Sequence, residues 1–126
     1  MEDIRGNTSQ LHKDALRVVK ELFPHHNISN EFPIKIGNNT LYLDIYIKEL
    51  KIAVETDGEQ HQKFNKFFHG DAAGFARAKR NDAMKEEFCK NNNIALVRLT
   101  KKEIDKDTLL KKIRLALKER VDERDD

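Results

Sequence analysis

Residues 40–58, TLYLDIYIKELKIAVETDG, contain two runs in which apolar side chains alternate with other side chains. Such alternation predicts two β-strands, over Thr40–Lys48 and Lys51–Asp57, joined by a two-residue turn. In the first strand, Leu41, Leu43, Ile45 and Ile47 are expected on a core face, and Tyr42, Asp44, Tyr46 and Lys48 on a face outside the core. In the second strand, Ile52, Val54 and Thr56 share one face, and Ala53, Glu55 and Asp57 share the other.

The short turn between these strands also predicts which residues face each other. Counting back along the ladder from a two-residue turn sets Asp44 directly opposite Glu55. Asp57 follows two residues after Glu55, so the three carboxylates are expected on one face of the sheet. Glu49 and Leu50 are not residues that tight turns prefer, and a slip by one residue would move one carboxylate to the other face.

Periodicity and turn residues predict the other elements. In chain order they are a helix over 9–23, a strand over 32–36, a long loop or broken helix over 58–74, a helix over 75–92, a strand over 94–99 and a helix over 106–120. Ser9 and Asp107 are candidate N-caps, and Gly37-Asn38-Asn39 is a hairpin turn. The helix over 75–92 should direct Phe75, Ala78, Met84, Phe88 and Cys89 inward, and Arg77, Lys79, Arg80 and Lys85 mostly outward. The predicted order is α-β-β-β-α-β-α.

The length of 126 residues has room for a single domain, residues 1–126, which we expect to consist of a core over about 9–118 and an acidic tail over 119–126. No apolar run approaches the ~20 residues that a membrane span needs, and Met1–Gln10 carries no hydrophobic signal segment. We therefore expect no membrane partner and an intracellular location. Cys89 is the single cysteine of the chain, so the chain can form neither an internal disulfide nor a thiolate-rich zinc site.

Charge is distributed unevenly along the chain, although the net charge is only +2. Residues 1–62 contain 7 Lys/Arg and 10 Asp/Glu, whereas residues 63–102 contain 10 Lys/Arg and 4 Asp/Glu. An acidic half next to a basic segment is the arrangement expected of a protein that holds a cation and binds a polyanion.

Carboxylates that face each other across two strands repel, so a positive charge must lie nearby. Lysines or solvent could neutralise them on an exposed face. The sharper interpretation is a divalent cation such as Mg²⁺, which takes oxygen ligands, and such an ion would suit phosphodiester hydrolysis. His61, shortly after Asp57, could then act as general base, general acid or metal ligand, or could simply be solvated.

The two strands and their flanks resemble a known family. Leu43-Asp44-Ile45-Tyr46-Ile47, followed by Ile52-Ala53-Val54-Glu55-Thr56-Asp57-Gly58-Glu59-Gln60-His61, is similar to the core of the PD-(D/E)xK nuclease superfamily, in the branch of very-short-patch-repair-like endonucleases and phage homing-endonuclease (EDxHD-like) domains. Arg80-Asn81-Asp82-Ala83-Met84-Lys85 and Ile94-Ala95-Leu96-Val97-Arg98-Leu99 resemble its second helix and fourth strand. The resemblance covers roughly residues 9–118 and implies a restriction-endonuclease-like α/β fold, with a central mixed sheet flanked by helices.

The resemblance also implies a site. Its metal ligands would be Asp44, Glu55, Asp57 and the backbone carbonyl of Thr56, and its other catalytic residues would be His61 and, as in some members, Glu21. Typical members have lysine as the last letter of the acidic motif, whereas this chain has Asp57 there. The group that activates water is therefore left open between His61 and a metal-bound hydroxide.

The basic segment completes this interpretation. Its candidate phosphate-binding residues are Lys63, Lys66, Arg77, Lys79, Arg80 and Lys85. Phe64, Phe67, Phe68 and His69 could stack against bases, or the phenylalanines could pin the loop to the core. Arg98 could orient a carboxylate or cap the sheet edge.

The expected function is that of a Mg²⁺- or Mn²⁺-dependent DNA endonuclease without a small-molecule cofactor, located in the cytoplasm of a bacterial or phage-infected cell. Double-strand cleavage by one site would require a homodimer or successive nicks. The alternatives are a DNA-binding module on this fold that has lost catalysis, and a small interaction protein that does not bind DNA.

Overall fold

The structure, a computed structural model of the 126-residue chain, describes residues 10–56 and 72–124. Its elements are α1 (Gln10–Leu22), β1 (Ser29–Ile36), β2 (Asn39–Ile47), β3 (Ile52–Thr56), α3 (Ala72–Asn91), β4 (Ala95–Leu99), a short 3₁₀ helix η2 (Lys101–Glu103) and α4 (Lys106–Arg124). Within these described residues, their order confirms the predicted α-β-β-β-α-β-α sequence of helices and strands, with η2 added before the last helix.

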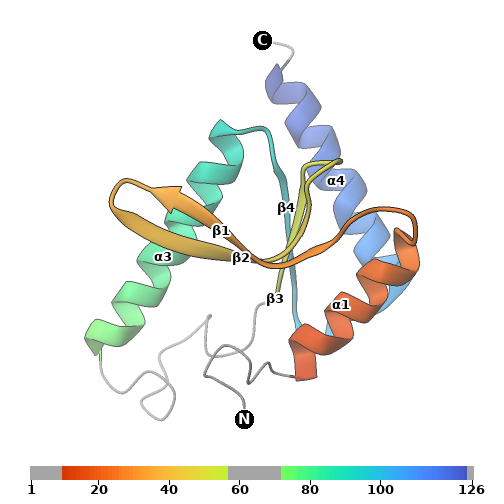
Figure 1. Cartoon of the computed structure of the whole chain (residues 1–126), viewed down its shortest axis with the longest axis horizontal. Helices are drawn as coiled ribbons and strands as arrows, with labels where there is room; N and C mark the ends of the chain where they lie inside the picture. Colours follow the sequence, from red (N-terminus) through yellow and green to blue (C-terminus); the bar gives the residue numbers. More distant parts are fainter. Residues whose placement is uncertain (1–9, 57–71, 125–126) are drawn as a thin grey trace.

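The four strands form one mixed sheet in the order β1-β2-β3-β4. β2 pairs antiparallel with β1 and with β3, whereas β4 pairs parallel with β3. A parallel pair needs a crossover connection, and α3 lies within the segment that joins β3 to β4. Figure 1 shows α3 on one side of the sheet and α1 and α4 on the other. The chain is thus an α/β protein with a central mixed sheet flanked by helices.

The β2–β3 hairpin has the predicted register. Ile47 pairs with Ile52 and Ile45 pairs with Val54, so the next positions along the two strands are Asp44 and Glu55. The turn closes where the N–H of Lys51 donates to the carbonyl of Lys48 at 3.2 Å. Lys51 adopts a positive φ of 55°, so a residue directly after the unfavourable pair Glu49-Leu50 takes up the left-handed conformation that tight hairpins require.

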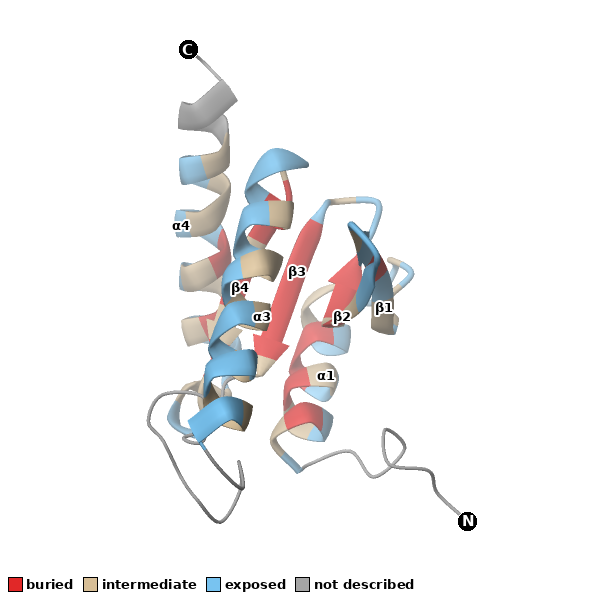
Figure 2. Cartoon of the chain, turned by 90° about the vertical axis from the view of Figure 1, so that its left-hand side faces the viewer, coloured by how far each residue is buried: buried red, intermediate tan, exposed pale blue. Residues whose placement is uncertain are grey.

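Both faces of the sheet are buried, which corrects the prediction of one core face. Ile45, Ile47, Ile52 and Val54 pack with α1 and α4, whereas Ala53 and Tyr46, which is 5% exposed, pack on the α3 side with Cys89. Figure 2 shows β2 and β3 largely in the colour of buried residues. Tyr46 is buried because α3 covers the face that the alternation left outside the core.

The alternation predicted that the apolar residues of β2 would all face one core. The structure divides them between two clusters on opposite sides of the sheet. Leu41 and Leu43 pack on the α3 side, whereas Ile45 and Ile47 pack on the other side. In the partner strand β1, Glu31 has a positive φ of 58° and lies where the change of side occurs. A left-handed residue interrupts the regular pleat of the hairpin, so the strict alternation of side chains is not kept across this point.

The starts of two elements and the N-cap of a third differ from the predictions. α3 begins at Ala72 and β1 at Ser29, each three residues before the expected start, while the N-cap candidate Ser9 lies outside the described residues. For α4, the cap is Asp105 and not Asp107. The Asp105 carboxylate accepts a hydrogen bond from the N–H of Thr108 at 2.8 Å and another from its hydroxyl at 2.9 Å.

The last helix continues to Arg124, so the tail expected over 119–126 is largely part of α4. Arg120, within that segment, donates from Nη1 to the carbonyls of Leu50, Lys51 and Asn93 at 3.1–3.2 Å. This guanidinium ties α4 to the β2–β3 turn and to the turn before β4. Within the part of the chain that the structure describes, no helix has both the length and the hydrophobicity needed to cross a membrane.

Candidate functional site

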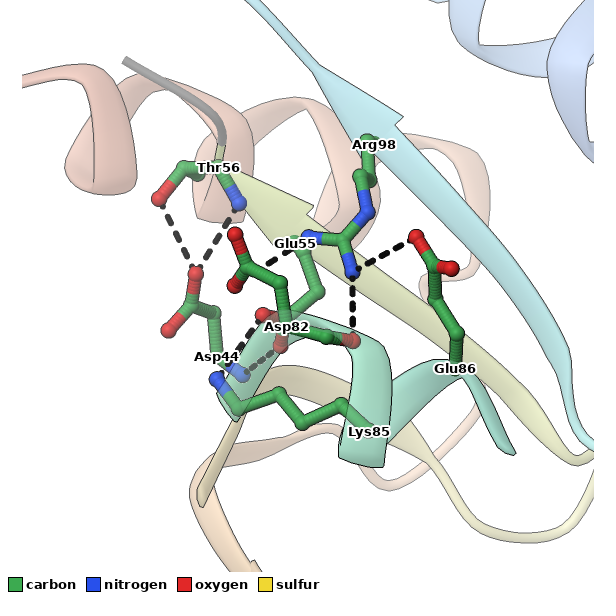
Figure 3. Close-up of polar contacts among 7 residues, drawn as sticks. All are labelled: Asp44, Glu55, Thr56, Asp82, Lys85, Glu86 and Arg98. Carbon is green, nitrogen blue, oxygen red and sulfur yellow. Dashed lines mark hydrogen bonds and ion pairs between the residues drawn. The ribbon is translucent and has the colours of Figure 1, made fainter. Parts of the chain in front are cut away.

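Asp44 and Glu55 bridge the point where the β2–β3 ladder ends. The N–H of Asp44 donates to Oε2 of Glu55 at 2.7 Å, and the N–H of Thr56 donates to Oδ2 of Asp44 at 2.9 Å. The Thr56 hydroxyl donates to the same Asp44 oxygen at 3.1 Å. Each carboxylate therefore takes the place of a backbone carbonyl on the neighbouring strand. This exchange fixes both side chains next to each other (Figure 3).

Glu55 is a buried carboxylate paired with a lysine from another element. Its side chain is 4% exposed, and its Oε1 lies 3.0 Å from Nζ of Lys85 on α3. Burial raises the pKa of Glu55, the neighbouring Asp44 raises it further, and Lys85 acts in the opposite direction. The Lys85–Glu55 pair thus supplies the positive charge that the facing carboxylates required.

The prediction that Lys85 points outward is wrong, because its side chain is only 15% exposed. Sequence reasoning therefore missed its place in the site. The available signal was its position four residues before the inward-facing Cys89, which puts both residues on one face of the helix.

Arg98 lies beside Glu55 on the next strand, where the two residues are paired in register. Its guanidinium lies 3.8 Å from the Asp82 carboxylate and 3.3 Å from the Glu86 carboxylate, and it donates to the Asp82 carbonyl at 3.4 Å. Asp82, Lys85 and Glu86 belong to one stretch of α3. Ion pairs of Lys85 with β3, and of Asp82 and Glu86 with Arg98 on β4, therefore join the helix to the strands (Figure 3). Of the two predicted roles for Arg98, the structure supports contact with carboxylates.

An open cavity lies against this cluster. It has a volume of about 350 Å³ and is lined by Glu31, Leu41, Tyr42, Asp44, Ala78, Asn81, Asp82 and Lys85. The cavity joins the Asp44 end of the sheet to the inner face of α3. A ligand in it would meet both Asp44 and the ammonium of Lys85.

The donor chemistry of this cluster suits a hard divalent cation. Asp44 uses Oδ2 for its two bonds to Thr56, and its Oδ1 accepts no hydrogen bond among the described residues. Glu55 already holds a cationic group at Oε1, the Lys85 ammonium. Mg²⁺ commonly takes one or two carboxylates together with water and phosphate oxygens, and Asp44 and Glu55 would supply that number.

Several predicted ligands cannot be placed in the site. Asp57 and His61 lie outside the described residues, and within the described ones no group of three or more His, Cys, Asp or Glu is arranged to hold a metal. Thr56 contacts Asp44 through its amide and its hydroxyl, so it holds that carboxylate in place. Its carbonyl stays a prediction as a ligand.

Glu21 is on the other side of the sheet from the Lys85–Glu55 pair. It is 43% exposed, and its carboxylate lies 3.7 Å from the guanidinium of Arg17 and 3.8 Å from the ammonium of Lys106 on α4. α1 packs with α4 on the face that α3 does not cover. The structure therefore does not bring Glu21 together with the two carboxylates.

The predicted phosphate-binding residues occupy different surroundings. Lys63 and Lys66 lie outside the described residues, whereas Arg77, Lys79 and Arg80 are exposed on α3. At about 100° per residue, Arg77 lies about 80° round the helix from Lys85, Lys79 about 120° and Arg80 about 140°. Arg77 is thus the exposed cation nearest to the inner face of α3.

The chain is similar to two uncharacterized viral proteins. It is 38% identical over 63 residues to protein 307L of Invertebrate iridescent virus 6, and 31% identical over 62 residues to protein 033L of Invertebrate iridescent virus 3. These regions cover 50% and 49% of this chain but only 32% of each relative, so the chain spans about a third of the length of the curated relatives it matches. No family model and no solved structure matches the chain.

Proposed function

We propose that this chain is a metal-dependent DNA endonuclease with a restriction-endonuclease-like fold of the PD-(D/E)xK type. The observation that carries the proposal is the meeting of Asp44, Glu55 and Lys85, from three separate elements, at the edge of an open cavity. Asp57 occupies the position at which typical members of the PD-(D/E)xK superfamily, which the sequence resembles, have lysine. Lys85 brings a lysine to the second carboxylate from α3, which supports this proposal.

The residues of the site have distinct roles in this proposal. Asp44 and Glu55 would hold Mg²⁺ or Mn²⁺, and Thr56 keeps Asp44 oriented through its amide and hydroxyl. When bound, the ion would polarise the scissile phosphate, lower the pKa of a water molecule and stabilise the leaving oxygen. Lys85 would provide a positive charge for the phosphate in the cavity. His61 and Asp57 stay proposed members of the site.

DNA is the proposed substrate because of the basic residues next to the cavity. Arg77 is exposed on α3, and Lys85 lies at the cavity itself. Cations spaced along a helix next to a metal site suit a phosphate backbone. Sequence specificity and double-strand cleavage would come from a homodimer or from further domains, in keeping with relatives about three times as long as the region they share with this chain.

Plasmid nicking tests the proposal. We expect the protein to convert supercoiled plasmid to the open-circular form with Mg²⁺ or Mn²⁺ and to stop when EDTA is added. Asp44→Asn should reduce the rate by at least about a hundredfold, since it removes a charge that holds the metal. Asp107→Asn is a matched control, because Asp107 is an exposed residue of α4. Equal nicking by wild type and Asp44→Asn would contradict the proposal.

One observation favours the second candidate, a DNA-binding module without catalysis. Both oxygens of Glu55 are already satisfied by the Asp44 amide and the Lys85 ammonium, so the carboxylate is stable in the fold without a metal. On this interpretation Glu55 has become a structural residue. Salt-dependent DNA binding without nicking in either metal would then support the binding module and contradict the endonuclease.

A further inference from the structure

We infer that Lys85 is an internal cation that competes with the divalent metal for Glu55, so that metal binding requires the Lys85 ammonium to leave this carboxylate. The inference rests on the metal site of the proposed function and concerns how that site is kept closed. It assigns Lys85 a regulatory role in addition to any contact with phosphate.

The partners of the carboxylate oxygens carry the argument. Oε2 of Glu55 accepts from the Asp44 amide at 2.7 Å, and Oε1 accepts from Lys85 at 3.0 Å. Oδ2 of Asp44 accepts from both the amide and the hydroxyl of Thr56. Of these four oxygens, only Oδ1 of Asp44 accepts no hydrogen bond among the described residues. A cation that binds both carboxylates must therefore take an oxygen of Glu55 that is already in use.

Lys85 is the partner that can be displaced. The Asp44 amide is part of the sheet and cannot move without breaking it, whereas lysine has a flexible four-carbon stem. The side chain of Lys85 is 15% exposed and lines the open cavity, so its ammonium has a route into solvent. α3 itself can stay in place, because Arg98 holds it through Asp82 and Glu86.

The Lys85–Glu55 pair also gives a reason for a lysine to lie at the proposed metal site, because it stabilises the metal-free protein. A buried carboxylate next to a second one is costly unless a positive charge compensates it. Glu55, 3% exposed and next to Asp44, has this problem whenever no metal is bound. Lys85 solves it in the metal-free protein, at the expense of metal affinity. The site would therefore bind a divalent ion weakly and release it readily.

Calorimetric titration with Mn²⁺ tests the competition. At pH 8, Lys85→Met should bind Mn²⁺ about tenfold more tightly than wild type, equivalent to about 1.4 kcal/mol, because the competing charge is gone. Lys85→Arg keeps the charge and should bind like wild type. Lys90→Met, an exposed lysine in the last turn of α3, is the matched control and should also leave the affinity unchanged. Adding Asp44→Asn to Lys85→Met should abolish binding.

Thermal unfolding gives a second measurement, because Lys85→Met leaves Glu55 without its partner and should lower the stability of the metal-free protein. Saturating Mn²⁺ should then raise the melting temperature of Lys85→Met more than that of wild type. Lys85→Met that unfolds without metal but folds on addition of Mn²⁺, followed by circular dichroism, would equally support competition. Mn²⁺ binding by Lys85→Met that is no tighter than that of wild type, or absent, would overturn the inference.

The two proposals fail separately. A wild-type protein that binds Mn²⁺ with the predicted Lys85 competition but never nicks DNA would contradict the endonuclease and leave the inference intact. A protein that nicks plasmid in Mn²⁺, while Lys85→Met binds the ion no better, would overturn the inference and leave the endonuclease intact.

Discussion

Glu55 shows how a charged residue can lie in a buried position of a small protein. It occupies a strand in which Ile52, Ala53 and Val54 are all 0–3% exposed, and it is itself only 3% exposed. Its charge is compatible with that burial because the Asp44 amide and the Lys85 ammonium both donate to it. Either partner alone would leave one oxygen unsatisfied, which is why the site depends on both the hairpin and the helix.

Cys89 is a second buried residue whose chemistry the surroundings change. It is 1% exposed, and burial, followed by the nearby charge of Glu55, raises the pKa of its thiol to about 12. At pH 8 the folded protein should therefore contain about a thousandfold less thiolate than a chain with an unperturbed thiol. We expect DTNB to label the folded protein very slowly and the urea-unfolded protein within seconds to minutes.

The same shift predicts a pH dependence of stability. Because the folded pKa of Cys89 lies above the unfolded one, the unfolded chain loses this proton first as the pH rises. The contribution of the thiol to stability is complete below the unfolded pKa and is lost as the pH rises toward 12. Cys89→Ala should therefore show a smaller loss of stability between pH 8 and pH 11 than wild type. Rapid DTNB labelling of the folded protein would contradict this account.

At the scale of the element, α3 has two different faces. Its inner face carries Lys85 and Cys89 toward the sheet, and its outer face carries exposed cations. Lys79 on the outer face lies 5.7 Å from the centre of the Phe75 ring, a cation–π contact within the helix. The exposed cations of α3 are therefore not equivalent as phosphate contacts. Lys79 contacts the Phe75 ring, and Arg77 and Arg80 lie at different angles round the helix.

The geometry of α3 predicts unequal contributions to DNA binding. Arg77 lies nearest to the cavity side of the helix and Arg80 lies nearly opposite. Arg77→Ala should weaken binding several-fold and reduce the salt slope by about 1, because one phosphate contact is lost. Arg80→Ala is the matched control and should have a smaller effect. Fluorescence anisotropy of a labelled duplex, titrated at several NaCl concentrations, measures both quantities.

Equal losses from Arg77→Ala and Arg80→Ala would mean that DNA does not favour the cavity side of α3. The proposed site would then not be next to the bound backbone. Such a result would change the proposed orientation of DNA on α3, whether or not the protein cleaves DNA.

The elements themselves were largely predictable, because their signals are local. Alternation predicted β2 and β3, and counting from an expected two-residue turn predicted the register that sets Asp44 opposite Glu55, although the observed turn spans residues 48–51. The changed face of Leu43 was not predictable in this way, since alternation assumes a regular strand and the hairpin contains a left-handed residue, Glu31. The cap at Asp105 was missed because Asp107 offers the same side chain two residues later.

On the scale of the whole molecule, Arg120 connects parts that are far apart in sequence. One nitrogen donates to the carbonyls of Leu50, Lys51 and Asn93, so two turns far apart in sequence meet at a single guanidinium. Arg120→Ala should lower the free energy of unfolding by about 2 kcal/mol, because a charged donor to partly buried carbonyls is lost. Arg114→Ala, exposed on the same helix, should change it by less than about 0.5 kcal/mol.

Urea denaturation measures both variants. A loss in Arg120→Ala no larger than that in Arg114→Ala would mean that the three carbonyls are equally well satisfied by water. The end of α4 would then contribute little to the stability of the fold.

The sequence by itself determined the order of the elements and the facing pair Asp44 and Glu55, because a hairpin with a short turn is governed by neighbouring residues. Only the tertiary structure decided what neutralises that pair. Lys85 lies 30 residues after Glu55, and the two meet because the parallel β3–β4 crossover lays α3 on one face of the sheet. No local period encodes the position of a helix over a sheet, since it depends on packing across the whole core.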